Sequence, residues 1–197
     1  MYRKDKKDEF YTRKAREEGY PARSVYKLKE IDEKYMIFKK GDKVLDLGCA
    51  PGSWLKYISE KIGDNGKVIG VDLSELNMPI TKNMIFIQKD IFNLTDADLG
   101  SKKFRAVVCD MAPKTSGIKL ADEALSFELA ENSWEIAKKF LAPNGIFLCK
   151  IFESEIIRDF FREIEKNFEF AKRFRPSAII KGSSEIYLVA KNFKKHD

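Results

Sequence analysis

Acidic residues close three apolar, β-branched runs in the first 110 residues of the chain. Asp72 ends KVIGVD, Asp90 ends MIFIQKD and Asp110 ends FRAVVCD. The run before them, Lys43–Gly48, stops in a glycine-containing turn that leads into the expected helix Ser53–Ile62. A strand, a glycine turn, a helix and then an acid about 20 residues later are what a nucleoside-binding α/β site needs, because the glycines admit the ligand and the acid accepts its ribose hydroxyls.

The glycine turn argues against a dinucleotide as the ligand. It reads Gly48-Cys-Ala-Pro-Gly52, not G-x-G-x-x-G, and Pro51 removes a backbone donor where a pyrophosphate would need one. An adenosine without phosphates fits better, which favours S-adenosylmethionine, with Asp72 at its ribose and Asp90 near its adenine amino group. The alternatives are a dinucleotide site and a doubly wound domain whose strand-end acids only cap turns and helices.

Lys150 lies in IFLCKIFE, near the end of a strand that should be central and buried. Lysine is almost never fully buried without a partner. Asp110 ends the neighbouring strand, and Glu185, which opens the run EIYLVA, can reach the same edge. One interpretation is a buried ion pair that terminates the sheet. The other is a site that handles a proton or positions a charge beside a methyl donor.

Alternating strands and helices predict an α/β fold with a mostly parallel sheet, helices on both faces and an antiparallel hairpin of the last two strands. The link 73–83 is short for a crossover helix, so a turn can replace it. We expect a basic N-terminal arm with its helix in residues 1–40 and a single domain in 41–197. The expected elements are helix 24–33, strand 43–48, helix 53–62, strands 67–72, 84–90 and 104–110, helix 121–141, strand 145–151, helix 155–167 and strands 170–175 and 185–190.

Composition narrows the class of protein. The chain has 197 residues and a net charge of +6, and residues 1–29 carry ten Lys and Arg against five acids. A second basic group, Lys172, Arg173, Arg175 and Lys181, comes late. The two groups are typical either of solvated surface or of a polyanion-binding protein.

No apolar run reaches the ~20 residues of a membrane span, and the N-terminus has no secretory signal. Three cysteines without CxxC spacing predict buried, reduced thiols in a cytoplasmic protein. The single histidine, His196, argues against zinc, and we expect no metal site. A monomer is the expected state.

Several motifs, in the same order, resemble the FtsJ (RrmJ, RlmE) family of ribose 2′-O-methyltransferases. They are ARSVYKLKEID, DLGCAPGSW, DMAPKTSG (Asp110–Gly117), CKIFE and EIYLVA, and together they cover nearly the whole chain. The resemblance implies a Rossmann-like, S-adenosylmethionine-dependent fold with seven strands. It also implies a catalytic K-D-K-E tetrad, supplied here by Lys27, Asp110, Lys150 and Glu185.

The resemblance places Trp54 at the cofactor and retains Gly52 of the first motif. The cofactor-binding candidates are therefore Gly52, Trp54, Asp72, Asp90 and Asp110. In the implied reaction a ribose 2′-oxygen attacks the sulfonium methyl group. Lys150 acts either as a general base, if burial lowers its pKa, or as a fixed charge that stabilises the alkoxide, if its carboxylate neighbours prevail.

The implied substrate is a uridine of large-subunit ribosomal RNA, with RNA and not DNA as the partner. The alternatives are a tRNA ribose 2′-O-methyltransferase, a non-catalytic RNA-binding assembly factor on the same scaffold, and a small-molecule methyltransferase. Loss of tetrad or cofactor residues would favour the assembly factor, and binding without salt dependence would favour the small-molecule enzyme.

Overall fold

The computed structural model describes residues 6–100, 103–113 and 116–194, with the side chains of residues 6 and 7 excepted. Arg3, Lys4, Thr115 and His196 lie outside the described residues. Among the described helices, none combines the length and the apolar character that crossing a membrane requires.

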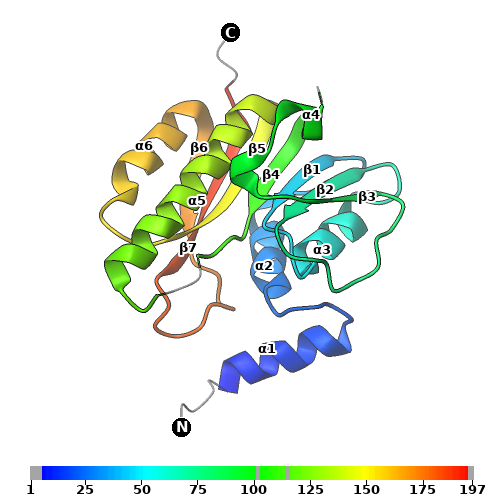
Figure 1. The fold of residues 1–197 in the computed structure, drawn as a ribbon, viewed down its shortest axis with the longest axis horizontal. Helices are drawn as coiled ribbons and strands as arrows, with labels where there is room; N and C mark the ends of the chain where they lie inside the picture. The colour runs from blue at the N-terminus through cyan, green and yellow to red at the C-terminus, as the bar shows by residue number, and fades with distance from the viewer. Residues whose placement is uncertain (1–5, 101–102, 114–115, 195–197) are drawn as a thin grey trace.

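A sheet of seven strands in the order β3-β2-β1-β4-β5-β7-β6 forms the centre of the molecule (Figure 1). β7 pairs antiparallel with both β5 and β6, whereas the other pairs are parallel. The expected mostly parallel sheet with a terminal antiparallel hairpin is therefore confirmed. The strands are β1 (Lys43–Leu47), β2 (Lys67–Asp72), β3 (Met84–Gln88), β4 (Phe104–Cys109), β5 (Leu141–Phe152), β6 (Phe168–Phe174) and β7 (Glu185–Phe193).

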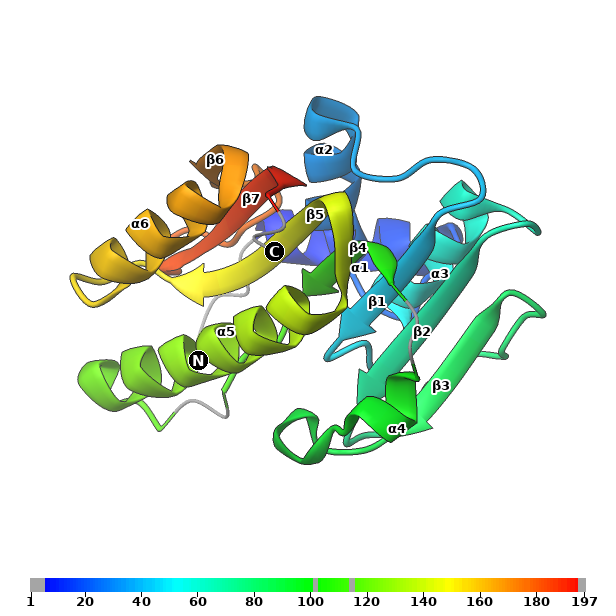
Figure 2. The same ribbon diagram turned by 90° about the horizontal axis from the view of Figure 1, so that it is seen from above.

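Helices cover both faces of the sheet, as Figure 2 shows from above. Neighbouring residues of one strand face opposite sides, so Leu45 joins one hydrophobic cluster with α5 and α6, and Val44 joins the other with α1, α2 and α3. The helices are α1 (Lys6–Glu17), α2 (Val25–Tyr35), α3 (Ser53–Ile62), α4 (Asp96–Leu99), α5 (Lys119–Phe140) and α6 (Ile157–Asn167), with a 3₁₀ turn η1 (Ile91–Asn93).

Aromatic packing holds α5 to the strands. Trp134 is fully buried, its ring lies 5.5–6.0 Å from those of Phe147, Phe168 and Phe193, and its Nε1 donates a 2.6 Å hydrogen bond to Glu163. Burying one such side chain stabilises a fold by roughly 1.5–3 kcal/mol. All three cysteines are buried and free, as expected from their places in or beside strands.

Three short or polar elements were missed by the sequence pattern. α1 is too polar to show an apolar stripe, and α4 and η1 span four and three residues. The link between β2 and β3 contains no helix, in agreement with the expected turn. β5 begins at Leu141, four residues before the expected start at Gly145, because the Phe104–Leu141 pairing precedes an irregularity in its register with β4.

Candidate active site

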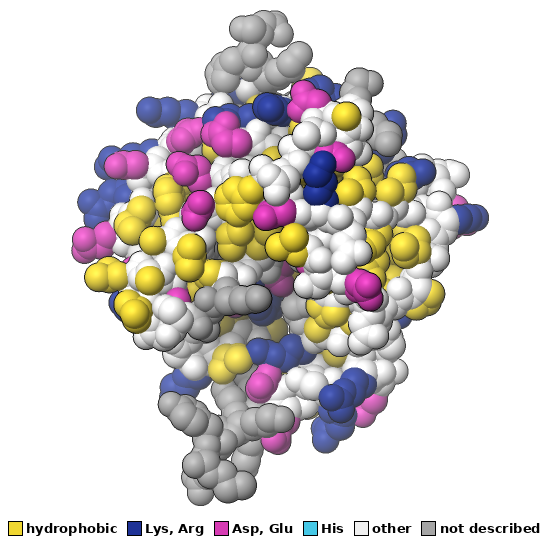
Figure 3. All heavy atoms as spheres, in the orientation of Figure 1, with side chains coloured by type: hydrophobic (Ala, Val, Ile, Leu, Met, Phe, Trp, Pro, Cys, Tyr) yellow, Lys and Arg dark blue, Asp and Glu magenta, His cyan; other side chains and the backbone are white. Residues whose placement is uncertain are grey.

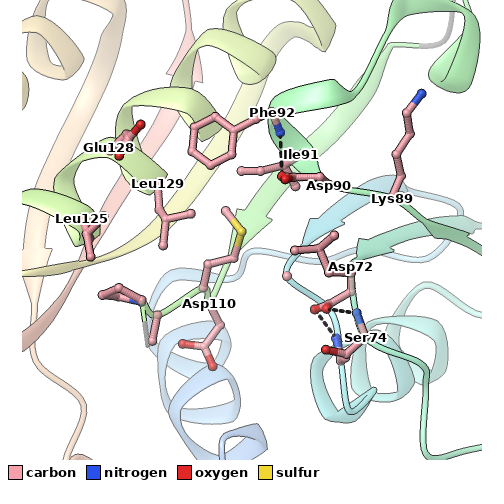
Figure 4. Close-up of a pocket in the computed structure, with 16 residues that line it drawn as sticks. Asp72, Ser74, Lys89, Asp90, Ile91, Phe92, Asp110, Leu125, Glu128 and Leu129 are labelled. Carbon is pink, nitrogen blue, oxygen red and sulfur yellow. Dashed lines mark hydrogen bonds between the residues drawn. The ribbon is translucent and has the colours of Figure 1, made fainter. Parts of the chain in front are cut away.

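A pocket of about 530 Å³ opens at the carboxyl ends of β1, β2 and β4, where open parallel sheets bind ligands. Its volume suits a small molecule of nucleoside size. The walls carry Asp72, Asp90 and Asp110, together with the apolar side chains of Leu73 and Phe92. In Figure 4, Asp72 and Asp110 lie on opposite sides of the opening, and α5 contributes Leu125, Glu128 and Leu129. Figure 3 shows hydrophobic side chains gathered over α5 around this hollow.

Two of the pocket acids are held by backbone amides (Figure 4). Asp72 accepts 2.9 Å and 2.8 Å hydrogen bonds from the N–H groups of Ala50 and Ser74. Asp90 accepts a 3.1 Å bond from the N–H of Phe92 and thereby caps η1. Each carboxylate has further acceptor capacity, because its two oxygens offer about four lone pairs. The amides therefore fix the orientation of both acids and leave them able to accept ligand hydroxyl or amino groups.

The glycine turn brings Gly48 and Ala50 to the pocket wall, whereas Gly52 and Trp54 are not among the lining residues. Gly52 has φ +114°, a conformation that L side chains rarely adopt, and starts α3. Trp54 is 3% exposed, donates a 3.0 Å hydrogen bond from Nε1 to the carbonyl of Ser24, and stacks on Tyr187. In this structure Gly52 shapes the turn, and Trp54 joins the start of α2 to the sheet.

Asp46 lies beneath the same turn, at the end of β1, and its side chain is fully buried. Among the described residues neither of its carboxyl oxygens has a hydrogen-bond partner. Burial, with smaller contributions from Asp110, Cys109 and Asp72, raises the pKa of Asp46 well above its ordinary value. Buried polar groups normally have a partner, so this carboxyl group is a candidate contact for a polar group of a ligand bound above it.

The four residues of the expected tetrad come together from α2, β5, β7 and the residue that directly follows β4. Lys27 Nζ on α2 lies 2.5 Å from Glu185 Oε1 at the start of β7. Lys150 Nζ on β5 lies 3.1 Å from Asp110 Oδ1 and donates a 2.5 Å hydrogen bond to the backbone carbonyl of Asp110. Lys27 and Lys150 are 9% and 6% exposed, so both ammonium groups are largely removed from water. Asp110 belongs both to the pocket and to this cluster.

Tyr187 is part of the cluster but was missed at the sequence level. Its hydroxyl lies 2.6 Å from Asp110 Oδ1 and 2.8 Å from Glu185 Oε1, and its ring is fully buried. A hydroxyl has one proton, so it donates fully to one carboxylate or shares the proton between the two. Tyr187 lies two residues after Glu185 and therefore on the same face of β7, which is the signal that could have identified it.

In this cluster Lys150 and Asp110 each shift the pKa of the other toward its charged form. Burial raises the pKa of Asp110, but Lys150, Lys27 and the Tyr187 hydroxyl lower it more, so its pKa lies below the ordinary value. Burial lowers the pKa of Lys150, but Asp110 and Glu185 raise it more, so its pKa lies above the ordinary value. At neutral pH, Lys150 is therefore an ammonium and Asp110 a carboxylate.

Comparisons with known proteins agree with this geometry. The model of the FtsJ-like methyltransferase family matches residues 20–193. The protein named ribosomal RNA large subunit methyltransferase E from Desulfatibacillum aliphaticivorans is 47% identical, over 91% of this chain and 87% of that relative. The protein of the same name from Bdellovibrio bacteriovorus is 44% identical, over 91% and 93%.

Solved structures show the same fold. A protein described as a ribosomal RNA methyltransferase from Plasmodium falciparum superposes with a TM-score of 0.77 and 32% identity, over 88% of this chain and 98% of that chain. Aeropyrum pernix fibrillarin, solved with bound S-adenosylmethionine, gives a TM-score of 0.59 at 19% identity, over 85% and 76%, and so supports the fold alone. The expected Rossmann-like methyltransferase fold is confirmed, and the chain belongs to the FtsJ-like methyltransferase family.

Proposed function

We propose that this methyltransferase transfers a methyl group from S-adenosylmethionine to a ribose 2′-hydroxyl of large-subunit ribosomal RNA. The observation that carries the proposal is the cluster of Lys27, Asp110, Lys150 and Glu185, which adjoins a nucleoside-sized pocket through Asp110. The names of the relatives support ribosomal RNA as the substrate class. We further expect the enzyme to act as a monomer in the cytoplasm.

The pocket residues fit the cofactor. Asp72 would accept the ribose hydroxyls, Asp90 would accept the adenine amino group, and Leu73 and Phe92, which line the same pocket, would offer apolar surface to the adenine ring. The carboxyl group of Asp46, which has no partner among the described residues, is available to a polar group of the cofactor. When bound, the cofactor supplies the activated methyl group.

The cluster supplies the groups that the methyl acceptor needs. A ribose hydroxyl is a weak nucleophile, and its oxygen carries negative charge as it bonds to the methyl group and as its proton passes to the Asp110 carboxylate or, late in the step, to water. The Lys150 ammonium, fixed by the side chain and the carbonyl of Asp110, can orient the 2′-oxygen and stabilise that charge. The raised pKa of Lys150 therefore supports an electrostatic role rather than a general-base role. Lys27 and Glu185 form a second ion pair beside the first.

Transfer of a labelled methyl group to three acceptors tests the substrate. The acceptors are unmodified large ribosomal subunits, naked large-subunit RNA and bulk tRNA. Label at a ribose 2′-oxygen of subunit RNA is the expected result. Label only in tRNA would overturn the ribosomal assignment, and no label despite measurable cofactor binding would overturn catalysis.

Substitution of Lys150 tests the mechanism in the same assay. Lys150→Ala should abolish transfer while cofactor affinity stays within about twofold of the wild type. Lys150→Arg keeps the charge but does not lose its proton near neutral pH, so measurable residual activity is expected from an electrostatic role. Loss of activity in Lys150→Arg equal to that in Lys150→Ala would favour the general base.

A further inference from the structure

A basic groove of about 580 Å³ lies between the C-terminal end of α2, the edge strand β6 and the end of β7. Its cations are Lys34, Lys172 and Lys191, and among the described residues that line it there is no acid. Arg173, the next residue of β6, places its guanidinium on the other face of the sheet, 4.6 Å over the Phe161 ring of α6. Such a run of uncompensated positive charge at a concave surface attracts a polyanion.

Aromatic rings form the floor between these cations. The ring of Tyr35 lies 5.9 Å from that of Phe170 and 5.5 Å from that of Phe174, and all three side chains are half-buried. Lys34 Nζ lies 4.3 Å above the centre of the Phe174 ring. A cationic groove with aromatic faces is the combination by which proteins hold single-stranded nucleic acid, because phosphates pair with the cations and bases stack on the rings.

The backbone at the groove is unusual. Among the described non-glycine residues, three have positive φ, and two of these, Met36 (φ 52°) and Asn192 (φ 62°), line the groove. Met36 ends α2 in the position that usually carries glycine, and its side chain is 68% exposed. The conformation therefore presents a large apolar side chain to solvent beside the aromatic rings, where it can contact a bound base.

The groove and the catalytic cluster share two elements. On α2, Lys27 of the cluster and Lys34 of the groove are seven residues apart, about 10 Å at 1.5 Å per residue. On β7, Glu185 and Lys191 are six residues apart, about 20 Å at 3.4 Å per residue. One strand only a few nucleotides long can therefore occupy both places.

We propose that the basic groove holds a single-stranded segment of the RNA substrate that flanks the methylated nucleotide. The inference rests on the proposed function and adds a second contact surface to it. Pairing of β6 with a second copy of this chain is disfavoured, because charged side chains such as Lys172 protect an edge strand from edge-to-edge pairing. An acidic protein could pair with the cations of the groove, but it has no nucleic-acid bases to stack on the aromatic rings.

Paired variants test the charges. Lys34→Ala/Lys172→Ala removes two exposed groove cations, and Lys67→Ala/Lys82→Ala removes two exposed cations from the start of β2 and the loop before β3. Each phosphate contact to a single strand contributes a slope of about −0.7 to the dependence of log K on log salt concentration. The groove variant should therefore lose about 1.4 in slope and about 25-fold in RNA affinity at 0.1 M salt. Its kcat and its affinity for S-adenosylmethionine should not change.

Phe170→Leu tests the stacking. It keeps an apolar side chain and every charge, so RNA affinity should fall at least fivefold with an unchanged salt slope. Thermal denaturation of each variant verifies folding. Groove variants that bind RNA like the Lys67→Ala/Lys82→Ala control would overturn the groove while leaving transfer by the wild type intact. Failure of the wild-type chain to methylate RNA would overturn the proposed function instead. A change in oligomeric state without a change in RNA affinity would assign the groove to a second copy.

Discussion

The substitution Tyr187→Phe removes one hydroxyl from the centre of the proposed catalytic cluster. The ring should stay in place, because it is fully buried and stacks on Trp54 with ring centres 5.9 Å apart and an interplanar angle of 28°. What is lost is the hydrogen bond that the hydroxyl makes to Asp110 and Glu185, at 2.6 Å and 2.8 Å. The change therefore isolates the polar role of Tyr187.

The expected magnitude follows from the charge of the acceptors. A hydrogen bond to an ionised group contributes about 1.5–3 kcal/mol to stability, so the free energy of unfolding should fall by about that amount. If the same interaction orients Asp110 against Lys150 in the transition state, the loss corresponds to a kcat lower by about tenfold to 150-fold. Affinity for the cofactor should change little.

The pH dependence gives a second signature. The Tyr187 hydroxyl is one of the groups that lower the pKa of Asp110. A carboxyl group whose pKa is lowered in the folded state stabilises the fold at pH values above its ordinary pKa. That stabilisation is lost as the pH falls through the lowered pKa. Without the hydroxyl the pKa of Asp110 should rise, so activity and stability should begin to fall at a higher pH than in the wild type.

The control is Tyr57→Phe. Tyr57 donates a 2.8 Å hydrogen bond to Asp32 in the buried interface of α2 and α3, away from the pocket. The Tyr57→Phe variant should lose about as much stability as Tyr187→Phe but keep the kcat and the pH profile of the wild type. If Tyr187→Phe behaves in the same way as Tyr57→Phe in the methyl-transfer assay, the positioning role of Tyr187 is refuted.

Three further predictions concern stability and cofactor binding. Lys150→Met leaves Asp110 without its nearest cation and should lower the free energy of unfolding, measured by chemical denaturation, by about 3–5 kcal/mol. The double variant Lys150→Met/Asp110→Asn should recover most of that loss. If it recovers none, the stabilising ion pair between the two residues is contradicted. Burial raises the pKa of Asp46, so the Tm of the wild type should fall as the pH rises through that pKa. Asp46→Asn should remove this fall in Tm and weaken cofactor binding. A Tm profile of Asp46→Asn equal to that of the wild type would contradict the role of Asp46 in the pH dependence. Gly52→Ala should lower the free energy of unfolding by about 1–3 kcal/mol and weaken cofactor binding. Gly182 also has a positive φ but open space around it, so Gly182→Ala should lower stability without changing cofactor affinity.

Local patterns in the chain were sufficient to predict the sheet and its ligand edge. Apolar β-branched runs ending in Asp72, Asp90 and Asp110 place three carboxylates at one edge, because parallel strands all present their carboxyl ends there. The short link before β7 predicted the antiparallel pair. These features depend on residues close together in sequence, and therefore they can be read from it.

The tertiary structure alone decided which charge Lys27 meets. Lys27 and Glu185 are separated by most of the chain, and the periodicity of α2 by itself is equally compatible with an exposed Lys27; packing of α2 against the sheet brings the two within 2.5 Å. Burial then sets the balance between desolvation and neighbouring carboxylates that keeps Lys150 charged. Residue types and spacing supplied the groups for this chemistry, but their pKa values and contacts depend on distances and solvent exclusion that only the folded chain creates.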